Sequence, residues 1–210
     1  MSIARDLKIS QKSAWFILQR IRETYNPTDG EVFTNEVEID ETYIRGKEKN
    51  KHQNKRTADN QGRSVKTKTP VLGILERDEK VYAIPVNDTK RETLIPIMVA
   101  KVEAGATIFT DEYRAYSTLK NDYNQDFFRY NANEYVSGNV HTNNIENFWS
   151  LLKRGLDGIY RHVSDKYLGR YVNEFTFRYN NIVLSEGSKF DVALANGTTK
   201  RLQYKTLING

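Results

Sequence analysis

The sequence predicts an α/β fold in which a mixed sheet is flanked by helices. Short runs of strand length, apolar or alternating with period two, occupy residues 35–44, 70–86 and 106–110. Apolar residues at spacings of three and four predict amphipathic helices before, between and after these runs. The 210 residues are 38% hydrophobic and 11% aromatic, which is enough for one sizeable core.

Residues 1–27 are expected to form a helical segment. Ser10 is a predicted N-cap, and an apolar stripe follows it at helical spacing: Ala14, Ile17, Leu18 and Ile21. A shorter helix precedes it, so the pair resembles a partial helix-turn-helix, a motif that binds DNA. A helical hairpin that only covers the core is the alternative. The breakers Pro27 and Gly30 end the segment.

Three antiparallel strands are expected next. In NEVEIDETYI, residues 35–44, the polar side chains of Glu38, Asp40 and Thr42 share one face. The runs PVLGILER and KVYAIPV, separated by Asp78 and Glu79, predict a hairpin that extends this strand into a meander.

Between the first strand and the hairpin lies a basic stretch, residues 45–69. Nine of its 25 residues are Lys or Arg, and apolar residues are nearly absent, which predicts a mobile loop. A solvated surface loop is one interpretation. The other is an arm that binds DNA phosphates through the following residues: Lys47, Lys49, Lys51, Lys55 and Arg56.

The rest of the chain alternates helix and strand. A Thr89–Glu92 capping box predicts a helix up to Gly105, although Pro96 conflicts with that start. The strand ATIFT ends at Asp111, a short helix follows, and DFFRYN is expected to be another strand. Helices are then predicted from Asn143 and over 164–181, and residues 186–210 form a tail.

This element order is the layout of the RNase H-like fold. It implies a mixed five-stranded sheet flanked by helices, spanning residues 33–185 with the basic loop inserted. Two predicted strands and one predicted helix each carry an acid: Asp40 within the first strand, Asp111 at the end of a later strand, and Glu146 at the start of a helix. In open α/β sheets that strand edge is where ligands bind.

Three converging carboxylates suit two divalent ions, Mg²⁺ or Mn²⁺, which can cleave phosphodiesters. Lys153 lies almost two helical turns after Glu146, so both are expected on one helix face. Lys153 and Arg154 are candidate phosphate contacts, and the alternative is that both belong to a solvated helix surface. Each acid also has a simpler interpretation. Asp40 is a solvated acid on an exposed sheet face, Asp111 caps the next helix, and Glu146 completes a capping box with Asn143.

The charge, the cysteine content and the absence of known motifs limit the classes of protein to which the chain can belong. The formal charge of +5 and pI of about 9.2 suit a polyanionic partner. There is no cysteine, which excludes disulfides and cysteine-ligated zinc. No membrane-length apolar run or signal peptide is present, so a cytoplasmic protein is expected, and association with the nucleoid is expected if it binds DNA in a prokaryote. No P-loop, G-x-S-x-G or dinucleotide fingerprint is present either.

Four segments carry a resemblance to a known family. VEIDETYIRGKEKNKH, TDEYRAY, HTNNIENFWSLLKRGLDGIYRHVS and YVNEFTFRYNN closely resemble the ISXO-like insertion-sequence transposases of the DDE group. The likeness runs from about residue 10 to the end of the chain. Family members commonly have RYNRR where this chain reads RYNNIV.

The resemblance implies an RNase H-like catalytic domain in which Asp40, Asp111 and Glu146 are the metal-binding acids and Lys153 the following lysine. It implies Mg²⁺-dependent cleavage at transposon ends and strand transfer into target DNA, by a homodimer or higher oligomer on double-stranded DNA. The family's N-terminal zinc ribbon is not matched, so the chain is expected to be N-terminally truncated. A catalytically inactive DNA-binding derivative and an RNase H-type or junction nuclease are the alternatives.

Overall fold

A computed structural model describes residues 2–26, 31–44, 68–111, 124–128, 142–160 and 163–209. For Ser2, Asp111 and residues 124–128 it describes the backbone only. Residues 45–67 of the predicted basic loop and the predicted helix after Asp111 lie outside the described residues. The predicted loop bound of 69 is wrong by one residue, because Thr69 begins the next strand.

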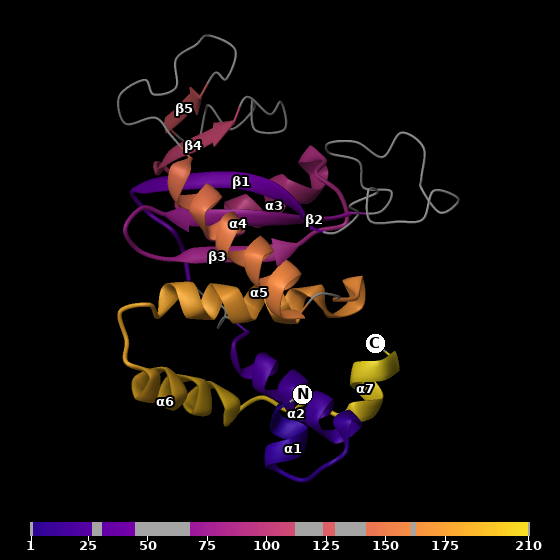
Figure 1. The fold of residues 1–210 in the computed structure, drawn as a ribbon. Coiled ribbons are helices and arrows are strands. Elements are labelled where there is room, and N and C mark those ends of the chain that lie inside the picture. The colour runs from indigo at the N-terminus through magenta and orange to yellow at the C-terminus, as the bar shows by residue number, and fades with distance from the viewer. Residues whose placement is uncertain are drawn as a thin grey trace, which may run out of the picture.

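The centre of the molecule is one mixed sheet (Figure 1), with its strands in the order β3-β2-β1-β4-β5. The strands are β1 (Glu36–Ile44), β2 (Thr69–Glu76), β3 (Val81–Pro85), β4 (Thr107–Asp111) and β5 (Asn124–Phe128). β1, β2 and β3 are antiparallel, whereas β4 and β5 run parallel to β1. The predicted α/β class, the meander and its hairpin are confirmed. Asp78 takes a positive φ of 61° in the hairpin turn.

Helices cover both faces of the sheet (Figure 1). One apolar cluster joins α3 (Arg91–Lys101) to β1, β2 and β4. A second joins β2 and β3 to α4 (Asn143–Gly155), a π-helical turn (Leu156–Tyr160) and α5 (Asp165–Asn180). The predicted helix over 164–181 is therefore confirmed. Within the described part of the chain, no helix has the length and apolar character needed to cross a membrane.

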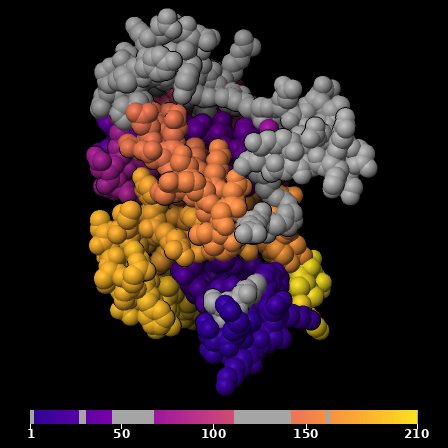
Figure 2. Space-filling model, in the orientation of Figure 1, coloured from indigo at the N-terminus to yellow at the C-terminus, as the bar shows by residue number. Residues whose placement is uncertain are grey.

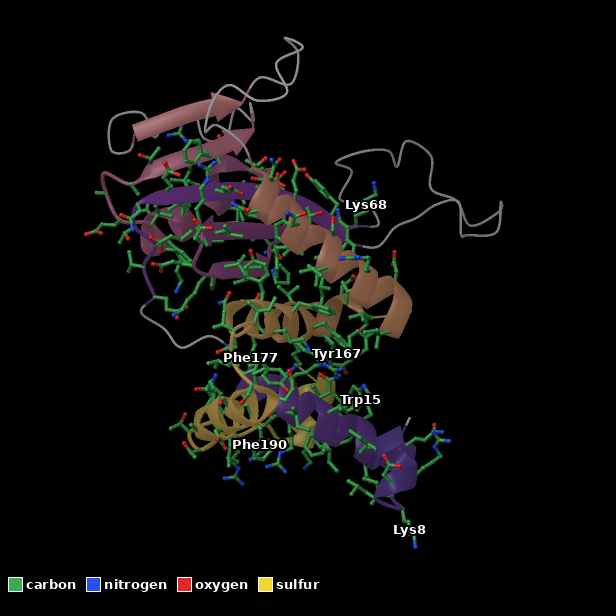
Figure 3. The ribbon with its side chains drawn as sticks, turned by 60° about the vertical axis from the view of Figure 1, so that its left-hand side comes forward. Lys8, Trp15, Lys68, Tyr167, Phe177 and Phe190 are labelled. Carbon is green, nitrogen blue, oxygen red and sulfur yellow. The ribbon has the colours of Figure 1, made fainter. Side chains whose placement is uncertain are left out.

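The two ends of the chain pack together against α5. α1 (Ser2–Asp6) and α2 (Gln11–Thr24) lie beside α6 (Glu186–Gly197) and α7 (Tyr204–Asn209), as the indigo and yellow surfaces in Figure 2 show. Ser10 caps α2 as predicted, since its hydroxyl oxygen accepts a hydrogen bond from the Ser13 backbone N–H. Trp15 meets Tyr167 of α5 edge-on, with ring centroids 5.4 Å apart (Figure 3).

The segment predicted as a tail, residues 186–210, contains the two helices α6 and α7. A DNA-binding role for α1 and α2 stays a prediction.

A buried ion pair joins α2 to α5. The Arg22 guanidinium donates to Glu174 at 2.9 Å, and its Cζ lies 4.1 Å from the centre of the Tyr171 ring. The Tyr160 hydroxyl and Arg178 donate to the other oxygen of Glu174, at 2.7 and 2.9 Å. Buried carboxylates need such partners, so this network fixes the N-terminal helices to the sheet layer.

The capping box predicted before α3 is wrong. The helix begins at Arg91, and its N-cap, Lys90, makes no side-chain cap hydrogen bond. Asp88 instead accepts hydrogen bonds from the Thr93 hydroxyl and the Lys90 amide, and these two bonds lower the pKa of Asp88. An aspartate that precedes the helix competes with the predicted Thr89 cap, because a carboxylate is the stronger acceptor.

Candidate catalytic site

Asp40 lies on the face of β1 that α4 covers. Its carboxylate oxygen Oδ2 accepts a hydrogen bond from the indole Nε1–H of Trp149, at 2.9 Å. Asp40 is half-buried and its neighbour Thr42 is buried, so this face is not the solvated sheet surface of the simpler interpretation. The aspartate is held in place by a residue of α4.

A glycine makes this contact possible. Gly73 on β2 is the direct partner of Asp40 across the antiparallel pair. A Cβ at Gly73 would lie 2.5 Å from Cζ2 of Trp149 and 2.9 Å from Cδ1 of Ile145. Because no side chain occupies that position, the indole lies against β2 and reaches Asp40.

Glu38, two residues before Asp40, caps the helix that covers it. The Glu38 side chain is fully buried and accepts four hydrogen bonds from donors within the described residues. Asn144 donates through its backbone and side-chain amides, Ile145 through its backbone amide, and Arg77 through Nε, all at 3.0–3.1 Å. A buried carboxylate is tolerated when its lone pairs are satisfied in this way. The first turn of α4 is therefore fixed to β1.

The predicted Asn143–Glu146 capping box is consequently wrong. The N-cap of α4 is Thr142, and it makes no side-chain cap hydrogen bond. The backbone amides that a local cap would satisfy are taken by Glu38 instead. Sequence reasoning placed Glu38 only on the strand face that it shares with Asp40, because its partners on α4 lie more than 100 residues away.

The backbone of Asp111 lies next to that of Asp40. β1 and β4 are parallel, and Ile39 pairs with Thr110. Asp40 and Asp111 are the next residues along, so the register places them on neighbouring strands, about 4.8 Å apart in the hydrogen-bonding direction. Asp111 ends β4 as predicted, and its side chain is not among those described.

Glu146 lies in the first turn of α4, three residues before Trp149, and its side chain is exposed. The Thr142 hydroxyl donates to its Oε1 at 3.4 Å. Residues three apart lie on one side of a helix, so Glu146 is on the side of α4 whose indole contacts Asp40. Its exposed carboxylate is not used in the predicted capping box, so a metal-binding role for Glu146 stays a prediction.

Lys153 and Arg154 lie in the last turn of α4 with exposed side chains. Arg154 Nε donates to the Ser150 carbonyl at 3.3 Å, so its stem follows the helix. Seven residues make almost two full turns, which puts Lys153 on the same side of α4 as Glu146.

The donor set fits a divalent ion by its chemistry. Carboxylate oxygens are the ligands that Mg²⁺ and Mn²⁺ take, and Asp40, Asp111 and Glu146 come from three neighbouring elements. Among the described side chains, which exclude that of Asp111, no three acidic or histidine groups are arranged to hold a metal. The three-acid set therefore remains a prediction, supported by the backbone placement.

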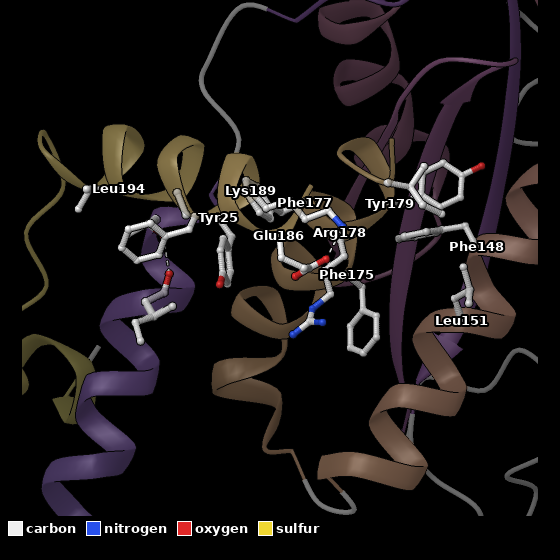
Figure 4. A pocket seen from close by; sticks show the side chains of 15 residues that line it. Tyr25, Phe148, Leu151, Phe175, Phe177, Arg178, Tyr179, Glu186, Lys189 and Leu194 are labelled. Carbon is white, nitrogen blue, oxygen red and sulfur yellow. Dashed lines mark hydrogen bonds and ion pairs between the residues drawn. The ribbon is translucent and has the colours of Figure 1, made fainter. Parts of the chain in front are cut away.

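An apolar cavity of about 680 Å³ lies elsewhere, between α2, α4, α5 and α6 (Figure 4). Aromatic and aliphatic side chains line most of it, among them Tyr25, Phe148, Phe175, Phe177 and Phe190. Neither Asp40 nor Glu146, the two predicted acids whose side chains are described, contributes to its wall. The cavity is thus a separate feature from these two acids.

Comparison with known sequences gives three matches. A family model described as "ISXO2-like transposase domain" matches residues 32–180. An "Uncharacterized protein in transposable element ISH50" from Halobacterium salinarum is 29% identical over 151 residues, covering 68% of this chain and 51% of that protein. An "Uncharacterized transposase-like protein" from Haemophilus influenzae is 28% identical over 102 residues, covering 49% of this chain and 82% of that protein. The chain thus spans about half the length of the Halobacterium protein.

Among solved structures, the chain is similar to one in the cryo-EM structure of the simian T-cell lymphotropic virus intasome in complex with PP2A regulatory subunit B56 gamma. The match has a TM-score of 0.43 and 12% sequence identity, and it covers 84% of this chain and 58% of that one.

Proposed function

The chain belongs to the ISXO2-like transposase domain family, and from that premise we propose that it is a DDE transposase acting on insertion-sequence DNA. It cleaves DNA at transposon ends in a Mg²⁺-dependent reaction and joins the freed 3′ ends to target DNA. Its sheet is an RNase H-like catalytic sheet, a proposal supported by the antiparallel β1–β2–β3 meander and the parallel strands β4 and β5.

One observation carries the assignment of the site. Asp40 and Asp111 occupy neighbouring positions on β1 and β4, and the first turn of α4, which carries Glu146, is bound to β1 through Glu38. Acids separated by more than 30 residues in sequence thus come from adjoining backbone segments. Acidic residues that only solvate a protein surface are not expected to gather on adjoining backbone segments in this way.

Asp40, Asp111 and Glu146 would hold two Mg²⁺ or Mn²⁺ ions. When bound, such ions activate a water or a 3′-hydroxyl and stabilise the leaving oxygen. The chain itself supplies the fixed positions: β1 carries Asp40, and the buried Glu38 holds α4 on that strand. Lys153 and Arg154, on the exposed part of α4, bind phosphates of the same DNA backbone.

The partner of this site is double-stranded DNA, at the transposon ends and at the target. Pairing of two ends calls for a homodimer or higher assembly on DNA. The basic residues of the 45–69 loop add phosphate contacts, and the net charge of +5 supports binding to a polyanion.

The test is a cleavage and strand-transfer assay on duplexes that carry the ends of the chain's own insertion element. Asp40→Asn is the sharpest variant, because an amide oxygen still accepts the Trp149 N–H while the metal-binding charge is lost. We expect its activity, and those of Asp111→Asn and Glu146→Gln, to fall by more than the roughly 10–100-fold that loss of an outer partner costs. Glu79→Gln, in the exposed turn after β2, is the control.

The alternatives give different results in the same assay. Full activity in Asp40→Asn would overturn the site. DNA binding without turnover by the wild type, in Mg²⁺ and in Mn²⁺, would identify a DNA-binding derivative. Cleavage of RNA–DNA hybrids or branched DNA in preference to transposon ends would identify a nuclease.

A further inference from the structure

We propose that Trp149 is a positioning residue for the metal-binding carboxylate of Asp40. The proposal rests on the proposed function, because it takes Asp40 as a metal ligand. The indole Nε1–H donates to Oδ2 of Asp40 at 2.9 Å, and the Trp149 side chain is almost fully buried. By holding one oxygen, the indole sets the rotation of the carboxylate and directs how it is presented to an ion.

The hydrogen bond between Trp149 and Asp40 does more than give the buried indole N–H an acceptor. A core tryptophan needs one acceptor, and a backbone carbonyl or water serves as well. Here the acceptor is an acid in the middle of a strand, where aspartate is disfavoured. A donor to a carboxylate forms a charge-assisted bond, roughly twice as strong as a neutral one.

The indole is itself fixed by contacts that do not involve Asp40. Its ring packs against that of Phe148, with centroids 5.1 Å apart, and its edge lies over Gly73. The N-terminus of α4 is bound to β1 through Glu38. Because the helix and the ring are held independently, Trp149 constrains Asp40 rather than following it.

Gly73 gives the proposal a second, independent residue. Glycine inside a strand weakens it and usually marks a close approach by another group. At Gly73 that group is the Trp149 ring, which a Cβ would meet at 2.5 and 2.6 Å. The strand therefore lacks a side chain at the position where the indole passes to reach Asp40.

The first test measures the binding of MgCl₂ and MnCl₂ to the whole chain by calorimetry, without DNA. Trp149→Phe keeps an aromatic ring but removes the N–H donor. We expect it to bind the ions about 10–100-fold more weakly, the usual effect of losing an outer-shell partner. Trp15→Phe removes the same group from α2, where Trp15 packs on Tyr167, and should bind the ions like the wild type.

Gly73→Ala tests the same contact without changing Trp149 or Asp40. We expect a comparable loss of ion affinity, since the new methyl displaces the ring. Gly158→Ala is its matched control, because a Cβ there meets no atom of the described residues within 4 Å. Thermal unfolding of all four variants separates a change in ion affinity from a loss of folded protein.

A spectroscopic readout leaves the site intact. In Trp15→Phe the fluorescence comes from Trp149, the second of the two tryptophans. Ion binding at Asp40 should change this emission, with Mn²⁺ quenching it, over the range of concentrations in which calorimetry detects binding. In Asp40→Asn the change should be lost.

The outcomes separate the two proposals. A wild type that binds neither ion and cuts no DNA overturns the proposed function and the positioning role with it. A wild type that binds ions, while folded Trp149→Phe and Gly73→Ala bind them equally well, overturns the positioning role only. The same holds if Trp149 emission does not respond to ions that bind.

Discussion

The Glu38 carboxylate accepts both amide groups of Asn144, the backbone N–H at 3.1 Å and the side-chain Nδ2–H at 3.0 Å. The strand that carries Asp40 thereby also holds the helix that carries Glu146. The site's separate elements are joined through a buried acid that is not itself one of the three predicted ligands.

Removal of the Glu38 carboxylate should lower the free energy of unfolding more than removal of an exposed acid does. Glu38→Ala leaves the first backbone amides of α4 without their acceptor and removes one of the carboxylates that pair with Arg77, so we expect a loss of about 3–5 kcal/mol in the free energy of unfolding. Glu79→Ala, in the exposed hairpin turn, should change it by no more than about 0.5 kcal/mol. Urea denaturation followed by circular dichroism measures both. Equal losses would contradict the capping role of Glu38.

Two arginines on one acid provide a matched pair. Arg22 and Arg178 both bind Glu174, with side chains 5% and 65% exposed. Arg22→Met should cost about 3–5 kcal/mol because Glu174 stays buried without its main partner. Arg178→Met should cost about 0–1 kcal/mol, as exposed pairs do. Denaturation curves test this, and a smaller loss for Arg22→Met than for Arg178→Met would show that α2 is not fixed by this pair.

The same network makes stability fall at alkaline pH. Burial, and then the hydrogen bond to Glu174, raises the pKa of Tyr160 above its usual value of 10.0. The unfolded chain then loses this proton first, so the free energy of unfolding should decline as pH rises above about 10, by up to about 1.4 kcal/mol per pH unit for one group. Burial also raises the pKa of Tyr25 and Tyr179, which adds to the decline.

Tyr160→Phe isolates the contribution of one phenol. Above about pH 10, its free energy of unfolding should fall less steeply with pH, by up to about 1.4 kcal/mol per pH unit, the slope that one proton contributes. At neutral pH the variant should be somewhat less stable, because it lacks the hydrogen bond to Glu174. Denaturation at pH 8, 10 and 11 measures the slope. An unchanged slope would show that Tyr160 titrates alike in the folded and unfolded chains.

DNA binding by α4 should be visible as a salt effect. Lys153→Ala and Arg154→Ala each remove one cation, so the slope of log K against log salt should become shallower by about 0.9 for each phosphate that is no longer neutralised. Lys80→Ala, which breaks an exposed pair with Glu31, is the control. Fluorescence anisotropy between low and physiological salt gives the slopes, and three equal slopes would remove α4 from the DNA interface.

The parts of the fold that could be predicted were those with a strong local signal. Alternation identified β1, the Asp78–Glu79 turn identified the hairpin, and the Ser10 cap and apolar spacing identified α2. Both capping boxes failed for one reason. Each was chosen from neighbours in sequence, while the acceptors actually used were Asp88 in one case and the distant Glu38 in the other.

The role of Trp149 could not be predicted from its position. Trp149 is buried, as an aromatic side chain on the inner side of a helix commonly is. Nothing local shows that the chain's Gly73 leaves room for it or that Asp40 accepts its N–H. The single hint in the sequence was a glycine inside an apolar strand.

The sequence by itself determined the mixed α/β class, the strands and helices that have a strong local pattern, and the family to which the chain belongs. Periodicity and motif spacing are properties of neighbouring residues, so they can be read along the chain. The tertiary structure decided which acid caps α4, which aromatic holds Asp40 and how the chain ends dock on α5. Those choices depend on groups brought together across more than 100 residues, where burial makes each unsatisfied polar atom costly and so selects its partner.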